Sequence, residues 1–186
     1  MKKGSTDQRP LNFPERDRVA SAPPVEVAIR PAELADVSAM AAIRAETWET
    51  KKYWESRIRT YMAGHLSARQ ASPRHAVFVA VRQLAVVGFI AGHRTTRHGC
   101  KGELQWIDVV ATHRRQGIAG VLILTLARWF VLQQALRVCI DVKPDNDAAR
   151  ALYAKYGSVD LKPNWMVWED IRTALNHCDG AMATGV

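Results

Sequence analysis

The sequence predicts a mixed α/β fold, in which helices cover both faces of a mostly antiparallel sheet. Apolar residues alternate in some segments and recur at helical spacing in others, so strands and helices interchange along the chain. Segments 75–82 and 85–94 are both strand-like and are separated by a short link, which predicts an antiparallel hairpin. Between residues 103 and 142 the pattern runs strand, helix, strand. Such a crossover joins parallel strands, so the sheet should contain one parallel pair.

The expected elements follow in chain order. Alternation predicts strands at 25–30, 75–82, 85–94, 102–111, 136–143 and 164–171. Helical spacing predicts helices at 32–48, 51–66, 117–132 and 146–157. The helix at 117–132 has few polar positions, which indicates that most of it is buried. Asn146 and Gly157 are suited to cap the two ends of the last helix.

Length and composition are those of one globular domain with tails. The chain has 186 residues, of which 48% are hydrophobic and 24% charged. Residues 1–24 are polar and rich in proline, and we expect a disordered N-terminal leader there. The folded domain should span residues 25–172, and residues 173–186 should form a loose C-terminal tail. The sequence therefore predicts a single domain that carries the function.

Charge and cysteine content narrow the class of protein. The net charge of +8 suits a polyanion or a ligand with several phosphates, although a solvated basic surface is an equal interpretation. Three cysteines without a CxxC pair indicate neither a disulfide framework nor a zinc site. There is no signal-peptide pattern, and the longest apolar segment, 118–127, is too short to cross a bilayer. We expect a cytoplasmic protein without a membrane partner.

One short stretch, RRQGIAG at residues 114–120, has the composition of a phosphate-binding turn. It follows a predicted strand and opens the buried helix. The first N–H groups of a helix have no internal partner and carry partial positive charge, so they attract anions. Glycines at 117 and 120 would let an anion approach the backbone, and Arg114 and Arg115 add charge. A solvated, glycine-rich turn is the alternative interpretation.

A second pattern lies downstream, in KPDNDAARALYAKYG. Asn146, Ala149 and Tyr153 are spaced three and four residues apart, so they share one helix face. Taken alone, Asn146 is typical of a helix cap and Tyr153 of the edge of a core.

Together the two segments resemble the GNAT superfamily of acetyl-CoA-dependent N-acetyltransferases. The family's cofactor motif, Gln/Arg-x-x-Gly-x-Gly/Ala, stands here at residues 114–119, and Val109 precedes it at the usual spacing. The family's Asn-x-x-Ala-x-x-x-Tyr-x-x-x-Gly segment is present from Asn146 to Gly157. The resemblance covers about residues 25 to 171. It implies a GNAT-type sheet whose parallel pair is splayed, and acetyl transfer to a primary amine by direct attack in a ternary complex.

The resemblance also implies a role for particular residues. The backbone of the basic turn would hold the pyrophosphate of coenzyme A, and the end of the preceding strand would pair with the pantetheine arm. Asn146 would contact the pantetheine or phosphate arm. Tyr153 would stand near the sulfur as general acid for the leaving thiolate. The implied cofactor-binding residues are Val109, Val110, Ala111, Arg114, Arg115, Gln116, Gly117, Ile118, Ala119, Gly120, Asn146 and Tyr153.

The general base has more than one candidate. Glu103 lies eleven residues before Arg114, where histone-type members of the family have a catalytic glutamate. A strand-edge glutamate in solvent is the plainer interpretation of Glu103. Asp108 is the rival because a carboxylate between apolar strand residues is unusual, and a water-mediated base is a third option. A metal held by His93, His98 and Cys100 is not expected, because they lie in a loop context without a fourth ligand.

Other functions are compatible with parts of the sequence. Gly117 to Gly120 is also a GxxG loop, as in nucleic-acid-binding KH domains, but a KH loop joins two helices and this one follows a predicted strand. We therefore expect no nucleic-acid partner. A GNAT domain that binds acyl-CoA without catalysis is a further alternative. The acceptor is expected to be a small amine, a protein N-terminus or a lysine, with a monomer and a homodimer both open.

Overall fold

The computed structural model describes residues 27–178 except 48, 68–69 and 72–73. The described chain forms a seven-stranded sheet in the order β1-β4-β5-β6-β7-β9-β8. The strands are β1 (Ala28–Pro31), β4 (His75–Arg82), β5 (Ala85–Arg94), β6 (Gly102–Val109), β7 (Val138–Asp141), β8 (Val159–Lys162) and β9 (Trp165–Trp168). Among the described strands, β6 and β7 alone pair in parallel, and all other neighbours in this sheet are antiparallel. The predicted fold class, with its single parallel pair, is confirmed.

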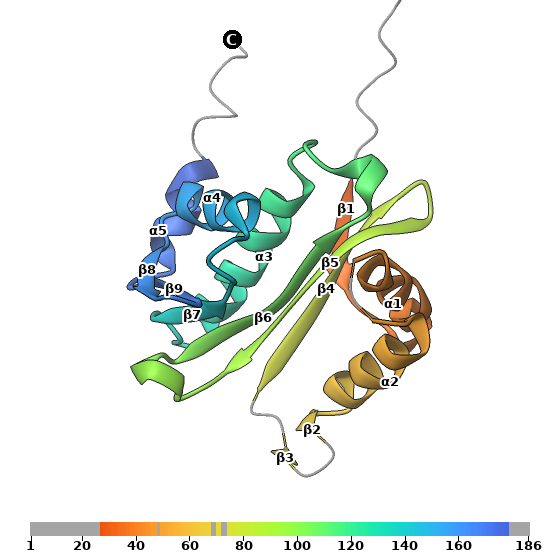
Figure 1. The fold of residues 1–186 in the computed structure, drawn as a ribbon, viewed down its shortest axis with the longest axis horizontal. Coiled ribbons are helices and arrows are strands. Elements are labelled where there is room, and N and C mark those ends of the chain that lie inside the picture. The colour runs from red at the N-terminus through yellow and green to blue at the C-terminus, as the bar shows by residue number, and fades with distance from the viewer. Residues whose placement is uncertain (1–26, 48, 68–69, 72–73, 179–186) are drawn as a thin grey trace, which may run out of the picture.

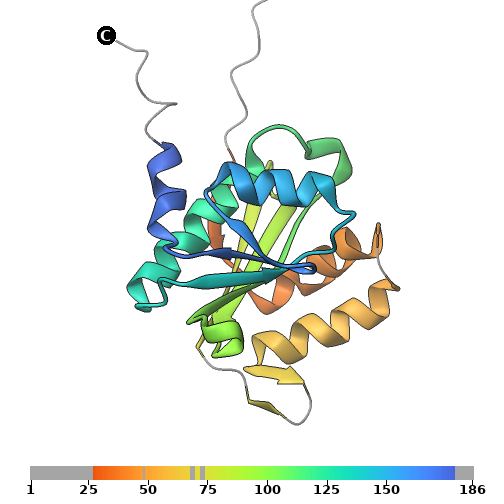
Figure 2. The same cartoon turned by 60° about the vertical axis from the view of Figure 1, so that its left-hand side comes forward.

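The helices divide between the two faces of the sheet (Figure 1). On one face lie α1 (Val37–Ala45), which follows a short 3-10 turn, and α2 (Lys51–Met62). On the other lie α3 (Ile118–Leu132), α4 (Asp147–Lys155) and α5 (Arg172–Leu175). Figure 2 shows the same division after rotation, with the sheet between the two groups. Each face has its own buried apolar cluster.

Helix α3 is as buried as its apolar sequence predicted. Most of its turns contribute a fully buried side chain, among them Leu122, Leu126 and Phe130. These residues pack against β4, β5 and β6, so the helix is fixed against the middle of the sheet. The loop that precedes it is therefore anchored at its C-terminal end.

Several elements were not expected from the sequence. The helix predicted at 51–66 ends at Met62, and the chain continues into β2 (His65–Ser67) and β3 (Gln70–Ala71). Strand β8 occupies residues for which no strand was predicted. Its mostly exposed position at the sheet edge permits the charged residues Asp160 and Lys162. At the C-terminal end, α5 and a 3-10 turn at Asn176–Cys178 extend the fold past residue 172. The expected leader at 1–24 lies outside the described residues.

Close packing around Gly102 gives a first prediction. A Cβ at this position would lie 2.5 Å from the Phe130 ring and 3.1 Å from Val138. Overpacking a dense core costs roughly 1–3 kcal/mol, so Gly102→Ala should lower the free energy of unfolding in urea by that amount. In a Phe130→Leu background the same substitution should cost clearly less, since the clashing ring is gone. Equal costs in the two backgrounds would contradict this packing argument.

Candidate active site

Strands β6 and β7 pair over only part of their length and then separate (Figure 1). Their ladder ends at the pair of Leu104 and Ile140, whereas β6 continues to Val109. A bulge lies at the point of separation, because Gln105 has no partner on β5. Bulges bend a strand and commonly occur beside functional sites. The result is a splay with the second half of β6 along one side.

The backbone of β6 presents free groups to this splay. Val110 donates its N–H to the Val87 carbonyl at 2.9 Å, so residue 110 faces β5. Because backbone groups alternate along an antiparallel strand, those of Ile107 and Val109 face the opposite edge, where β7 has ended. The Val109 carbonyl there accepts from Arg114 Nε at 2.9 Å. The groups open to a ligand are therefore both backbone groups of Ile107 and the Val109 N–H.

Val110 and Ala111, the next two predicted cofactor-binding residues, each use a backbone group in a hydrogen bond within the protein. The Val110 carbonyl accepts from the His113 N–H at 2.9 Å. The Ala111 N–H donates to Glu46 Oε2 at 3.4 Å, a long and exposed contact. Sequence reasoning included Val110 and missed Ile107, because the register against β5 decides which backbone groups point outward.

The basic turn leads into α3 through two residues with a left-handed backbone. After a 3-10 turn at Ala111–His113, the backbone is left-handed at Arg115 (φ 63°) and at Gly117 (φ 82°). The N–H groups of residues 117–120 open α3 and therefore have no acceptor within the helix. Ile118 is buried and Ala119 packs at the edge of the core, which fixes the start of α3. Gln116 steadies the exposed side by donating from Nε2 to the Thr112 carbonyl at 3.2 Å.

Glycine is required at position 120 for a different reason from the one that the sequence suggested. It is buried, and a Cβ there would collide with the hydroxyl of Tyr156 on the turn after α4. Close packing of these two segments, rather than the approach of an anion, requires glycine at 120. Gly117 has open space around its Cα, so its left-handed conformation is what favours glycine there.

Helix α4 brings Asn146 and Tyr153 to this side of the sheet. Asn146 caps the helix as predicted, because its Oδ1 accepts from the Ala149 N–H at 3.2 Å. Gly157 follows the helix with φ 88°, as expected of a C-terminal glycine. Tyr153 is 5% exposed, and its ring meets Trp168 edge-on at 5.9 Å. Burial, together with the charge of Asp108, raises the pKa of Tyr153, so its hydroxyl stays protonated at neutral pH.

Asp108 is held in an ion pair that the sequence did not predict. Its Oδ2 lies 2.5 Å from Arg44 Nη1, and the Arg44 guanidinium stacks over Trp54 at 4.0 Å. Burial raises the pKa of Asp108 and lowers that of Arg44, and the contact between them offsets both effects. The pair lies on the sheet face below α1, and the charges of both residues affect the pKa of Tyr153. Its acceptor oxygen is thus already committed to a cation.

Glu103 occupies a separate position in the paired part of β6. It is 6% exposed, and burial raises the pKa of its carboxyl group. Its Oε2 lies 3.3 Å from Arg97 Nε and 3.8 Å from His93 Nε2, yet accepts no hydrogen bond in the described structure. At about 3.3 Å per residue, Glu103 and Asp108 are about 16 Å apart along the strand. They are therefore independent carboxylate sites, and Glu103 lies beside the start of the splay.

The three residues considered for a metal face different neighbours. His93 lies between Tyr61 and Glu103, His98 packs edge-on against Trp165 at 4.6 Å, and Cys100 is buried beside Cys139. The described residues contain no cluster suited to a metal ion.

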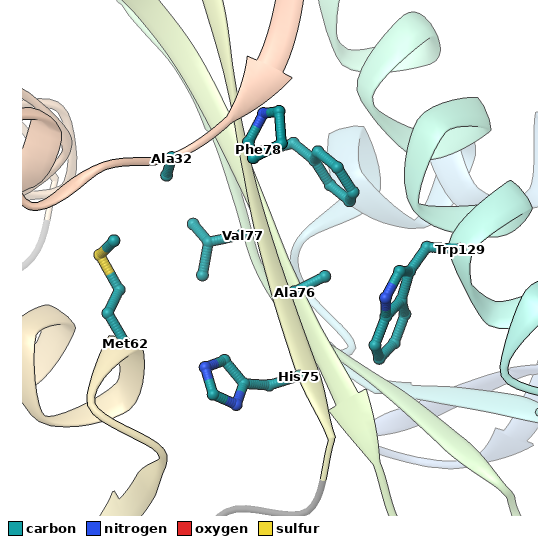
Figure 3. A pocket seen from close by; sticks show the side chains of 8 residues that line it. Ala32, Met62, His75, Ala76, Val77, Phe78 and Trp129 are labelled. Atoms are coloured by element: carbon teal, nitrogen blue, oxygen red, sulfur yellow. The ribbon is translucent and has the colours of Figure 1, made fainter.

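The structure also has a pocket of about 420 Å³ at the sheet edge (Figure 3). His75, Val77 and Met62 line it on one side of β4, and Phe78 and Trp129 on the other. Strand β5 lies between this pocket and the β6–β7 splay, so the pocket does not belong to the site described above.

Comparison with known proteins identifies the class. The model of the acetyltransferase (GNAT) family matches residues 37–157, and the chain belongs to this family. No curated protein matches the chain. None of the described helices is both long and apolar enough to cross a membrane.

Solved structures share the fold at low sequence identity. PaiA N-acetyltransferase of Thermoplasma acidophilum, in complex with coenzyme A, is 16% identical with a TM-score of 0.59, over 77% of this chain and 99% of that one. Ard1 of Thermoplasma volcanium is 23% identical with a TM-score of 0.59, over 76% and 94%. A GNAT acetyltransferase of Brucella melitensis, in complex with acetyl-CoA, is 16% identical with a TM-score of 0.57, over 78% and 88%.

Proposed function

We propose that the protein is an N-acetyltransferase that transfers the acetyl group of acetyl-CoA to a primary amine by direct attack in a ternary complex. The observation that carries this proposal is the splay between β6 and β7, with the basic turn before α3 at one end and the buried Glu103 carboxylate at the other. Solved GNAT structures with a similar fold contain coenzyme A or acetyl-CoA. A KH-type role is not supported, because the GxxG loop follows a strand.

The free backbone groups suit the cofactor from end to end. The N–H groups of residues 115–120 would bind the pyrophosphate, whose charge the start of α3 and Arg115 favour. Ile107 and Val109 would hydrogen-bond the pantetheine arm as a strand would, and the exposed Asn146 amide would contact the arm beyond them. The side chain of Arg114 would act indirectly by bracing the loop against Val109.

The chemistry needs a base for the amine and a proton for the thiolate. Glu103 would take the proton of the attacking amine, since its Oε2 has no hydrogen-bond donor and its raised pKa suits a base. The amine nitrogen then bonds to the thioester carbon. As the C–S bond breaks, the thiolate takes the proton of the Tyr153 hydroxyl. Asp108 suits the base role less well because it is paired with Arg44.

A screen of amines tests the function. Coenzyme A released from acetyl-CoA would be measured with a thiol reagent in the presence of polyamines, amino acids, or peptides with a free N-terminus or lysine. We expect release with at least one class of primary amine and none with the matched tertiary amine, which has no N–H to lose. Tight binding of acetyl-CoA without release in any amine would instead indicate a non-catalytic GNAT domain.

A substitution at Gly117 tests the cofactor site. Acetyl-CoA should raise the melting temperature of the parent, because a ligand selective for the native state stabilises it. Gly117→Asp should abolish this shift by placing a negative charge where the pyrophosphate binds. Gly117→Asn is the matched control, because asparagine tolerates a left-handed backbone and is nearly isosteric but uncharged. If the aspartate variant responds as strongly as the asparagine variant, the pyrophosphate binds elsewhere.

A further inference from the structure

A second buried polar residue faces Glu103 from the neighbouring strand. His93 on β5 is directly opposite Glu103 in the register of the sheet and is 3% exposed. Its Nε2 lies 3.8 Å from Glu103 Oε2, and its Nδ1 lies 3.3 Å from the hydroxyl of Tyr61 on α2. Tyr61 is 2% exposed and packs its ring on Trp106. Three polar side chains thus form a line through the apolar cluster below α1 and α2.

The order of donors and acceptors along this line follows from their ionisation. Burial, followed by the charge of Glu103, raises the pKa of Tyr61, so its hydroxyl keeps its proton. Burial lowers the pKa of His93 to about 4, so the imidazole is neutral near pH 7. The buried Tyr61 hydroxyl needs an acceptor for its proton, and among the described contacts that acceptor is His93 Nδ1, so we assign the hydroxyl as the donor. A neutral histidine that accepts at Nδ1 carries its proton on Nε2, the atom that faces Glu103.

We propose that Tyr61 and His93 form a hydrogen-bond chain that ends on Glu103 and positions this carboxylate as the base. The inference rests on the proposed function, because it assumes that Glu103 takes the amine proton. Tyr61 fixes the tautomer of His93, and the Nε2–H of His93 favours the ionised carboxylate. The 3.8 Å separation leaves this contact to tighten when the amine binds, as catalytic hydrogen bonds often do. His93 and Tyr61 are positioning residues that act through Glu103.

Other groups around the hydrogen-bond chain also shift the pKa values of Glu103 and His93. The Arg97 charge and the Thr95 hydroxyl lower the pKa of Glu103, whereas Asp141 on β7 raises it. The charges of Arg97 and His75 both lower the pKa of His93. Arg97 is largely exposed and accessible to solvent screening, so its effect is weakened, whereas His93 would add a buried donor beside the Thr95 hydroxyl. Loss of the chain should therefore be visible in the ionisation of Glu103.

The test is the dependence of kcat on pH in the full-length protein with a verified amine acceptor. Tyr61→Phe frees His93 to move its proton to Nδ1, and His93→Leu removes the donor outright. A hydrogen bond to a carboxylate is worth about one pKa unit or more, so both variants should shift the acidic limb upward by about one pH unit. At a fixed pH on the acidic limb kcat should therefore fall up to about tenfold, with KM for acetyl-CoA unchanged. His93→Gln can still donate toward Glu103, so the acidic limb should shift less in this variant than in His93→Leu.

Two controls separate this inference from the proposed function. His75→Gln alters another histidine that contacts the Tyr61 ring at 5.3 Å but donates to neither His93 nor Glu103, and it should leave the limb in place. In a Glu103→Gln background, Tyr61→Phe should have no further effect on the profile. If Glu103→Gln removes the limb but Tyr61→Phe and His93→Leu do not move it, the hydrogen-bond chain is disproved, whereas the assignment of Glu103 as the base still holds. If Glu103→Gln leaves the limb, both fail together.

Discussion

Glu103→Gln should lower kcat by about 10²–10⁴-fold near pH 7, the usual contribution of a general base. The substitution keeps the size of the side chain and removes only its ability to take a proton. Acetyl-CoA should still bind, because Glu103 lies in the paired part of β6 and not along the open edge that follows it. Steady-state kinetics and the acetyl-CoA-induced rise in melting temperature would measure the two effects separately.

The loss of kcat in Glu103→Gln should be largest within a defined range of pH. Below the raised pKa of Glu103 the parent enzyme has a protonated carboxyl group and gains little from it. Above the pKa of the amine, about 10 for a lysine-like acceptor, the nucleophile is already neutral. The difference between the parent and Glu103→Gln should therefore be largest between these two values. A profile that keeps its acidic limb in the variant would shift the assignment to Asp108 or to water.

Stability provides an internal control for Glu103→Gln. The pKa of Glu103 is raised in the folded state, so folding favours the protonated form and the charged form is destabilising. That cost is absent below the unfolded pKa and is complete above the folded one. The neutral glutamine should therefore raise the melting temperature at pH 7 while activity falls. A variant that is both inactive and less stable would point to misfolding.

Much of the site was predictable because its residues are close together in the sequence. The basic turn and the Asn146–Gly157 segment each lie within one loop or helix, so their spacing alone fixes their geometry. The Asn146 cap and the glycine after the helix at Gly157 are local features, and the structure confirms them. The single parallel pair also follows from chain order.

The rest depends on contacts between distant segments. Arg44 and Asp108 are 64 residues apart, and Tyr61 and His93 are 32 apart, so no periodicity relates them. A buried histidine on a strand gives no signal of its partner until the register against β6 is known. Strand β8 escaped prediction for another reason: an exposed edge strand needs no apolar alternation.

Tyr153→Phe should lower kcat roughly 10²-fold, the expected loss when a general acid is removed. The thiolate that leaves the tetrahedral intermediate needs a proton or a strong hydrogen bond. The raised pKa of Tyr153 ensures that the parent hydroxyl carries that proton at working pH. Phenylalanine keeps the ring contact with Trp168 and the filling of the core. Both the melting temperature and the affinity for acetyl-CoA should therefore remain close to those of the parent.

Comparison with Tyr153→Ala distinguishes the hydroxyl from the ring. Truncation of a buried aromatic residue leaves a cavity and costs about 3–5 kcal/mol, so the alanine variant should lose stability as well as activity. The phenylalanine variant should lose activity alone, and equally at all pH values at which the parent hydroxyl is protonated. If Tyr153→Phe keeps nearly parental kcat with a verified acceptor, the thiolate takes its proton from water or from another group. Tyr153 would then be a residue of the core.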